Sequence, residues 1–188
     1  MLEVSAARAE VANAERAGVP AELQAVYRAE FQYVFRSLRR LGVGEADLED
    51  LAHDVFLAVY RRWADYDAAR SVRPWLFGFA YRLASDHRRL SRHRHEVGGV
   101  IVDPADAARP ADEQLEAEQA RRAVLAALDT IALDRRAILV MHDLDGHPMP
   151  EIALGLSIPL NTAYSRLRLA RKDFEAAIRR ASAARGAR

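Results

Sequence analysis

The chain of 188 residues contains no cysteine and no long run of apolar residues. The first absence excludes a disulfide framework and a zinc site built on thiolates. The second excludes a helix that crosses a bilayer, because such a helix needs about 20 apolar residues. Residues 1–20 carry alternating charges where a signal peptide requires a hydrophobic stretch. We therefore expect a cytoplasmic protein without a membrane segment of its own.

Lysine is also scarce, since Lys172 is the only one and every other basic side chain except histidine is arginine. The planar guanidinium favours two-point contacts with phosphate or guanine, although a GC-rich genome produces the same bias. The formal net charge of +1 hides a segregated pattern. Acid gathers in residues 45–54 and 103–118, whereas base gathers in residues 82–95, 166–172 and 179–188. This distribution allows a polyanion as partner, which the net charge alone would not suggest.

Apolar residues spaced three and four apart predict an all-α fold with two small helical domains. The spacing predicts helices over residues 23–41, 46–63, 74–90, 115–128, 134–146, 150–156 and 160–177. Asp134 is expected to cap its helix and Gly146 to end it. The predicted organisation is an N-terminal extension (1–20), a three-helix domain (21–95), a flexible linker (96–112), a second domain (113–182) and a basic tail (183–188).

The most specific local pattern, PEIALGLSIPLNTAYSRLRLAR, runs from Pro150 to Arg171 and predicts a helix-turn-helix. Its apolar positions would pack the two short helices together. A polar face then points outward, formed by Asn161, Tyr164, Ser165, Arg168 and Lys172, with Arg166 and Arg171 at its margins. Such a face fits the major groove of DNA. The alternative is an ordinary helical hairpin with a solvated face, and the turn residue, often glycine in such motifs, is Ser157.

A second pattern combines base with aromatic residues on one predicted helix. The bases are Arg82, Arg88, Arg89, Arg92 and Arg94, with three histidines among them, and the aromatics are Trp75, Phe77, Phe79 and Tyr81. Single-stranded nucleic acid suits this combination, because cations follow its backbone and rings stack on its exposed bases. The alternative is a solvated basic helix end that the helix dipole stabilises.

A third pattern is an outward row on the second helix, formed by Asp50, His53, Asp54 and Leu57. Carboxylates beside a histidine can bind a metal or transfer protons. However, the sequence offers no nucleophile arrangement, phosphate loop or second ligand set. We therefore predict no catalytic residue, no metal and no cofactor, and we interpret the row as a docking face for a basic partner.

Taken in order, these motifs resemble the extracytoplasmic-function sigma factors of the sigma-70 family. The resemblance spans residues 26–178. In the first domain it is carried by DLAHDVFL (50–57), RPWLFGFA (73–80) and LASDHRR (83–89). In the second it is carried by LDRR (133–136), Gly146, EIA (151–153), Ile158-Pro159, and Thr162 with SRL (165–167).

The resemblance implies three functional surfaces. Core RNA polymerase is expected to bind Asp50, His53, Asp54 and Leu57. The minus-10 element, including its melted strand, is expected to contact Arg73, Trp75, Tyr81, Arg82, Ser85, Asp86, Arg88, Arg89 and Arg92. The minus-35 duplex is expected to contact Asn161, Thr162, Tyr164, Ser165, Arg166, Arg168, Arg171 and Lys172. An anti-sigma factor is a further expected partner.

The sequence departs from the family at several of these positions. Arg82 stands where the family usually has asparagine, and Tyr164 and Leu169 replace residues that are commonly basic. An unusual promoter sequence is therefore expected. Two rival functions stay open at this point: a stand-alone helix-turn-helix regulator that binds duplex DNA without polymerase, and a metal-dependent hydrolase built on the Asp50 row and other histidines.

Overall fold

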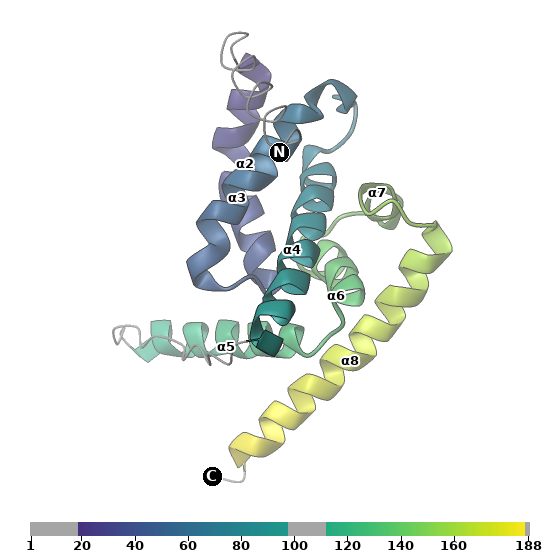
Figure 1. Cartoon of the computed structure of the whole chain (residues 1–188). Helices are drawn as coiled ribbons and strands as arrows, with labels where there is room; N and C mark the ends of the chain where they lie inside the picture. Colours follow the sequence, from purple (N-terminus) through teal and green to yellow (C-terminus); the bar gives the residue numbers. More distant parts are fainter. Residues whose placement is uncertain (1–18, 98–111, 187–188) are drawn as a thin grey trace.

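The computed structural model describes residues 19–97 and 112–186, with side chains for residues 19–91 and 119–183. All regular elements in these ranges are helices, which confirms the predicted all-α class (Figure 1). None of the described helices has an apolar stretch of the length and hydropathy needed to cross a bilayer. Most of the predicted N-terminal extension and linker falls outside the described residues.

The first bundle contains three helices: α2 (Ala21–Arg40), α3 (Leu48–Arg61) and α4 (Val72–Val97). Short 3-10 turns, η1 (Glu45–Asp47) and η2 (Trp63–Asp65), flank α3. The helices lie where the apolar spacing predicted them, because one stripe of each is buried. The stripes contribute the fully buried Val34, Leu38, Leu48, Val55, Val59, Leu76 and Ala80. Burial of this face of α3 turns its acidic face toward solvent.

The second bundle contains α5 (Asp112–Asp129), α6 (Leu133–Leu139), α7 (Met149–Gly155) and α8 (Leu160–Gly186). A turn of π-helix, η3 (Val140–Leu144), follows α6 directly. The helices α7 and α8 form the predicted helix-turn-helix, and α8 projects past the rest of the molecule (Figure 1). It continues beyond the predicted end at Ala177, into the segment expected to be a basic tail.

The prediction that Asp134 caps its helix is wrong. The capping position is Ala132, whose carbonyl accepts hydrogen bonds from the backbone amides of Arg135 and Arg136. Asp134 lies inside the first turn, and its carboxylate pairs with Arg166 of α8 at 3.3 Å. The acidic side chain therefore joins two helices of the second bundle instead of ending one.

The turn between α7 and α8 contains a residue in a strained conformation. Ser157 has φ +55° and is the only non-glycine residue with positive φ among the described residues. Side chains with a Cβ atom rarely adopt this conformation because the Cβ approaches the neighbouring carbonyl oxygen. The turn nevertheless keeps the geometry of the motif, since the Ile158 amide donates to the Ala153 carbonyl at 2.9 Å.

The two bundles pack against each other, a contact that the sequence did not predict. The main contact lies between α4 of the first bundle and α7 of the second (Figure 1). Buried residues of both bundles form one continuous apolar cluster. We call this interface the seam, and it determines which faces of α4 and α8 stay accessible.

We expect Ser157→Gly to stabilise the protein by about 0.5–1 kcal/mol, because glycine relieves the positive-φ strain and loses part of that gain to its larger unfolded-state entropy. Urea unfolding measures the change as a higher midpoint at an unchanged slope. Ser157→Ala is the control, since alanine keeps the strain and should not raise the midpoint. Equal midpoints for the glycine variant and the wild type would refute the strain.

Candidate nucleic-acid and polymerase interfaces

The predicted docking row on α3 is fully exposed. Leu57 has 51% of its surface exposed, and Asp50, His53 and Asp54 face solvent beside it. The His53 ring is held on both sides, by the Glu49 carbonyl at 2.9 Å and the Tyr27 hydroxyl at 3.3 Å. No group of acidic or histidine side chains in the described part of the chain is arranged to hold a metal ion. The row is thus an acidic surface with an exposed apolar residue.

Four aromatic rings gather where α3 ends and α4 begins. Trp75 contacts Tyr66 at 4.9 Å between ring centroids, Phe79 at 5.0 Å and Trp63 at 6.1 Å. The guanidinium of Arg82 lies 4.7 Å from the centroid of Phe79. Trp75 is only half-buried, so this cluster offers a ring and a cation side by side, as stacking on an unpaired base requires.

The sequence predicted only part of this cluster. Trp63 was expected to face the core and Tyr66 was not singled out, because both come from a segment outside the periodic stretch of α4. Phe77, which could equally have faced DNA, is fully buried. The positions on either side of a core residue are therefore the ones that stay available on α4.

The other predicted minus-10 residues fall into three groups. Arg73 and Arg88 are engaged, since Arg73 pairs with Glu30 at 2.9 Å and Arg88 donates to the Leu41 carbonyl at 3.2 Å. Asp86 and Arg89 are exposed and lie 3.6 Å apart. The half-buried residues are Tyr81 and Ser85. Arg92 belongs to α4, but its side chain lies outside the description.

The first turns of α8 have a buried face and an exposed face. The buried side chains are Ala163, Leu167 and Ala170. The opposite face exposes Asn161, Tyr164, Ser165, Arg168, Arg171 and Lys172, and Thr162 is half-buried. The Ser165 hydroxyl donates to the Thr162 carbonyl at 2.9 Å. This is the polar, cationic surface that the sequence predicted.

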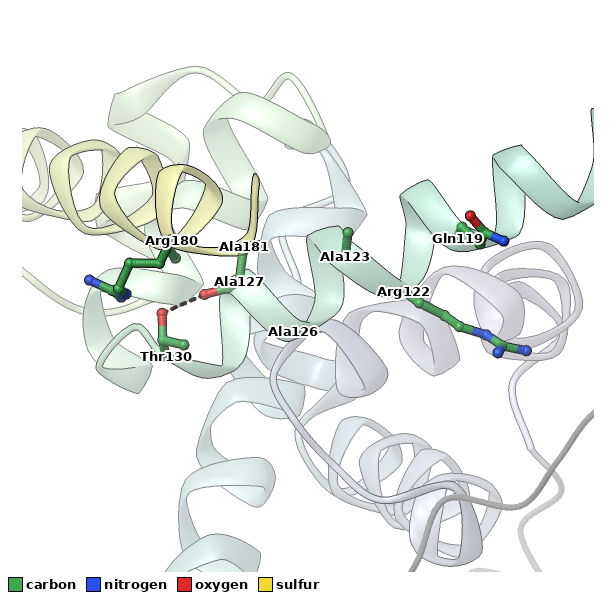
Figure 2. A pocket seen from close by; sticks show the side chains of 9 residues that line it. Gln119, Arg122, Ala123, Ala126, Ala127, Thr130, Arg180 and Ala181 are labelled. Carbon is green, nitrogen blue, oxygen red and sulfur yellow. Dashed lines mark hydrogen bonds between the residues drawn. The ribbon is translucent and has the colours of Figure 1, made fainter. Parts of the chain in front are cut away.

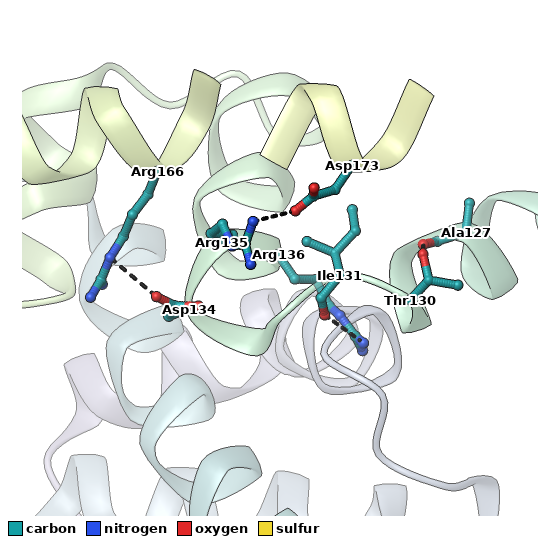
Figure 3. Close-up of polar contacts among 8 residues, drawn as sticks. All are labelled: Ala127, Thr130, Ile131, Asp134, Arg135, Arg136, Arg166 and Asp173. Carbon is teal, nitrogen blue, oxygen red and sulfur yellow. Dashed lines mark hydrogen bonds and ion pairs between the residues drawn. The ribbon is translucent and has the colours of Figure 1, made fainter. Parts of the chain in front are cut away.

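Two of the predicted minus-35 arginines are held by carboxylates. Arg166 pairs with Asp134 of α6 (Figure 3). Arg171 makes two hydrogen bonds to Asp143, at 2.9 and 2.7 Å, and these lower the pKa of the carboxyl. Arg168 and Lys172 have no ion-pair partner among the described residues. They are therefore the cations that can contact phosphate without first breaking a pair.

A buried arginine anchors the second bundle. Arg136 is completely buried, with a hydrogen bond to Asp129 at 2.7 Å and another to the Ile131 carbonyl at 3.2 Å (Figure 3). Burial lowers its pKa most, which the Asp129 carboxylate partly offsets. The sequence gave no sign of this role, because Arg135 and Arg136 are adjacent arginines and only one enters the interior.

A groove of about 720 Å³ lies between α5 and the far part of α8 (Figure 2). Alanine side chains from both helices form most of its wall: Ala123, Ala126, Ala127, Ala177 and Ala181. The Thr130 hydroxyl at its edge is occupied by a hydrogen bond to the Ala127 carbonyl at 2.8 Å. The groove thus lacks the convergent polar groups of a small-molecule site.

Comparison with known protein families matches both bundles separately. The sigma-70 region 2 family model matches residues 26–94, and the sigma-70 region 4 family model matches residues 121–174. These ranges contain the docking row, the aromatic cluster and the exposed face of α8.

Individual proteins agree with the family models. The chain is 28% identical over 146 residues to RNA polymerase sigma factor NccH of Alcaligenes xylosoxydans xylosoxydans, covering 75% of this chain and 78% of NccH. It is 30% identical over 164 residues to ECF RNA polymerase sigma factor SigE of Mycolicibacterium smegmatis, covering 86% of this chain and 63% of SigE.

A solved structure has the same fold. The sigma factor RpoE of Bartonella quintana, in complex with the anti-sigma factor NepR, aligns with a TM-score of 0.60 at 20% identity, over 81% of this chain and 96% of RpoE. The chain therefore belongs to the sigma-70 family, in its extracytoplasmic-function group of RNA polymerase sigma factors.

Proposed function

We propose that this sigma factor works through three surfaces on two domains, residues 21–95 and 113–182, with residues 96–112 setting the distance between them. One surface binds core RNA polymerase and two contact promoter DNA. The observation that carries the proposal is the exposed polar face of α8, whose buried counterpart Ala163, Leu167 and Ala170 holds it outward. Both domains fall within sigma-70 family matches, which a stand-alone helix-turn-helix regulator would not require.

Core polymerase binds the acidic row of α3 in this proposal. Asp50 and Asp54 supply negative charge, which speeds association with a basic partner. Leu57 adds apolar area that is half-exposed in the free chain and becomes buried on docking. The His53 ring, fixed by its two hydrogen bonds, gives the row a defined shape.

The minus-10 element meets the aromatic cluster and the arginines of α4. Unstacking a base costs a few kcal/mol, which stacking and pocket contacts must offset. Trp75 presents a ring for stacking, and Arg82 lies beside it over Phe79. The remaining proposed contacts are Arg73, Tyr81, Ser85, Asp86, Arg88, Arg89 and Arg92.

The minus-35 duplex receives the exposed face of α8. Arg168 and Lys172 contact phosphate or base directly, and Asn161, Tyr164 and Ser165 read neighbouring positions. Thr162, Arg166 and Arg171 lie at the margins of this face, and the two arginines exchange their carboxylates for DNA. A short tether gives the second contact an effective concentration around millimolar, so two weak contacts together select a promoter.

An anti-sigma factor is a further partner in this proposal, since the similar RpoE structure contains one. We place the protein in the cytoplasm, where the polymerase acts. Neither matching family model describes a catalytic protein, and a sigma factor supplies no catalytic group of its own. Reconstitution with core polymerase, followed by selection of transcribed promoters from a random library, tests the function as a whole. Absence of any selected promoter would refute it.

We expect Leu57→Ala to weaken binding of core polymerase about tenfold, because it removes the apolar residue at the docking surface. The measurement is equilibrium binding of labelled chain to core enzyme without DNA. Leu90→Ala is the matched control, since Leu90 has a similar exposed fraction, 55%, and lies on α4. If the two variants bind alike, α3 is not the docking element.

We expect Arg168→Ala to weaken promoter binding and to reduce the slope of log affinity against log salt by about 0.9, the value for one lost phosphate contact. The slope is measured with polymerase holoenzyme on a promoter found by the selection above. Arg28→Ala removes an equal charge from the exposed side of α2 and should leave the slope unchanged. An identical slope for both variants would remove Arg168 from the DNA interface.

A further inference from the structure

The seam between the bundles is built on two glycines that face each other. A methyl group on Gly78 of α4 would lie 2.2 Å from the carbonyl oxygen of Gly155 in α7. A methyl group on Gly155 would lie 2.5 Å from the carbonyl oxygen of Pro74. Both distances are shorter than any tolerated contact, so the helices approach this closely only because both residues are glycine.

Polar contacts join the bundles on one side of the glycines. Arg40 of α2 pairs with Asp145 at 2.6 Å. The buried Tyr33 ring makes an edge contact with His147, with the hydroxyl 3.4 Å from Nε2. These residues come from opposite bundles and are more than one hundred positions apart in the sequence.

The buried Arg136 lies at another part of the seam. A methyl group on Gly42, in the turn after α2, would lie 2.5 Å from Nη1 of Arg136 and 2.8 Å from Oδ1 of Asp129. The ion pair of the second bundle therefore packs directly on a turn of the first. Arg88 of α4 reaches the same turn through its hydrogen bond to the Leu41 carbonyl.

The seam engages several side chains that we propose as DNA contacts. The guanidinium of Arg73 lies 5.2 Å from the centroid of Tyr33, whose ring contacts the second bundle. Tyr81 feels the charges of Asp134 and Arg166 across the seam. Arg82 lies near the glycine contact, 3.6 Å from a methyl group placed on Gly78. Closure therefore removes minus-10 and minus-35 residues from solvent at the same time.

The seam also contains polar atoms that closure leaves without partners. Nε of Arg136 and Oε2 of Glu151 are buried with no hydrogen-bond partner among the described residues. A buried polar atom without a partner destabilises the state that buries it, and water can hydrate it once the bundles separate. The close glycine packing is thus opposed by these atoms, as expected of a contact that opens.

We propose that the seam is an autoinhibitory contact: the free chain rests closed, with α7 held against α4, and binds core polymerase and promoter only after the bundles separate. This inference rests on the function proposed above. A closed majority lowers the apparent affinity for polymerase by the fraction of molecules that are open. Anything that opens the seam without harming either bundle should therefore strengthen polymerase binding.

The test uses the full chain carrying Gly78→Ala. Alanine is the better helix former by about 1 kcal/mol, so α4 should fold at least as well while its new methyl group forces α7 away. Gly44→Ala is the matched control, because its methyl group would meet only Asp47 at an ordinary 3.8 Å. Gly155→Ala applies the same wedge from the opposite bundle.

Two measurements are combined. The absence of cysteine permits spin labels at introduced cysteines, Arg36→Cys on α2 and Arg121→Cys on α5, which are exposed positions on contacting helices. Opening should lengthen the distance between the labels in both wedge variants and not in the control. Affinity for core polymerase is measured in parallel and should rise about tenfold or more, since minor states usually make up 10% or less.

Two results would overturn the proposal. One is an unchanged label distance in both wedge variants, and the other is a lengthened distance with polymerase affinity within about twofold of the wild type. If the labels move apart but the wild type and all variants fail to bind polymerase, the closed seam stands and the proposed function fails. The two inferences are therefore separable in one set of samples.

Discussion

Burial of one stripe on each short helix is the constraint that decides everything else about the accessible surfaces. In α8 the stripe consists of Ala163, Leu167 and Ala170, and small side chains at two of the three positions bring the helix close to the body of the second bundle. The opposite face then has no choice but to meet solvent. The same rule on α3 buries Val55 and Val59 and exposes the acidic row.

Carboxylates divide the arginines into those that are available and those that are occupied. Arg136 is buried with Asp129, whereas Arg166 and Arg171 are paired on the surface. Exposed ion pairs contribute little stability, commonly below about 1 kcal/mol, so DNA phosphate can replace the carboxylate at small cost. A buried arginine cannot be exchanged in this way, because losing its partner leaves an uncompensated charge. Only the surface pairs are therefore compatible with DNA binding.

The sequence predicted the helices and the exposed face of α8 because both depend on local periodicity. It did not predict that Arg136 is buried and Arg135 is not, since that difference depends on a turn around Gly42, far away in the sequence. The pairing of Arg171 with Asp143 joins residues 28 positions apart and was missed for the same reason. Asp134 was misplaced as a cap because a carboxylate near a helix start has the same sequence pattern whether it caps the helix or pairs with a distant arginine.

The glycines of the seam show how a local preference yields to a tertiary one. Gly78 lies in the interior of α4, where alanine would favour the helix by about 1 kcal/mol, and no turn or positive φ at this position requires glycine. What requires it is the Gly155 carbonyl, 2.2 Å from the position of the missing methyl group. A residue that weakens its own helix in order to admit a second one indicates that the contact between the bundles is a specific feature of this fold. The tether between the domains then needs only to span two bundles that already meet, and separation, not approach, becomes the step that promoter binding has to drive.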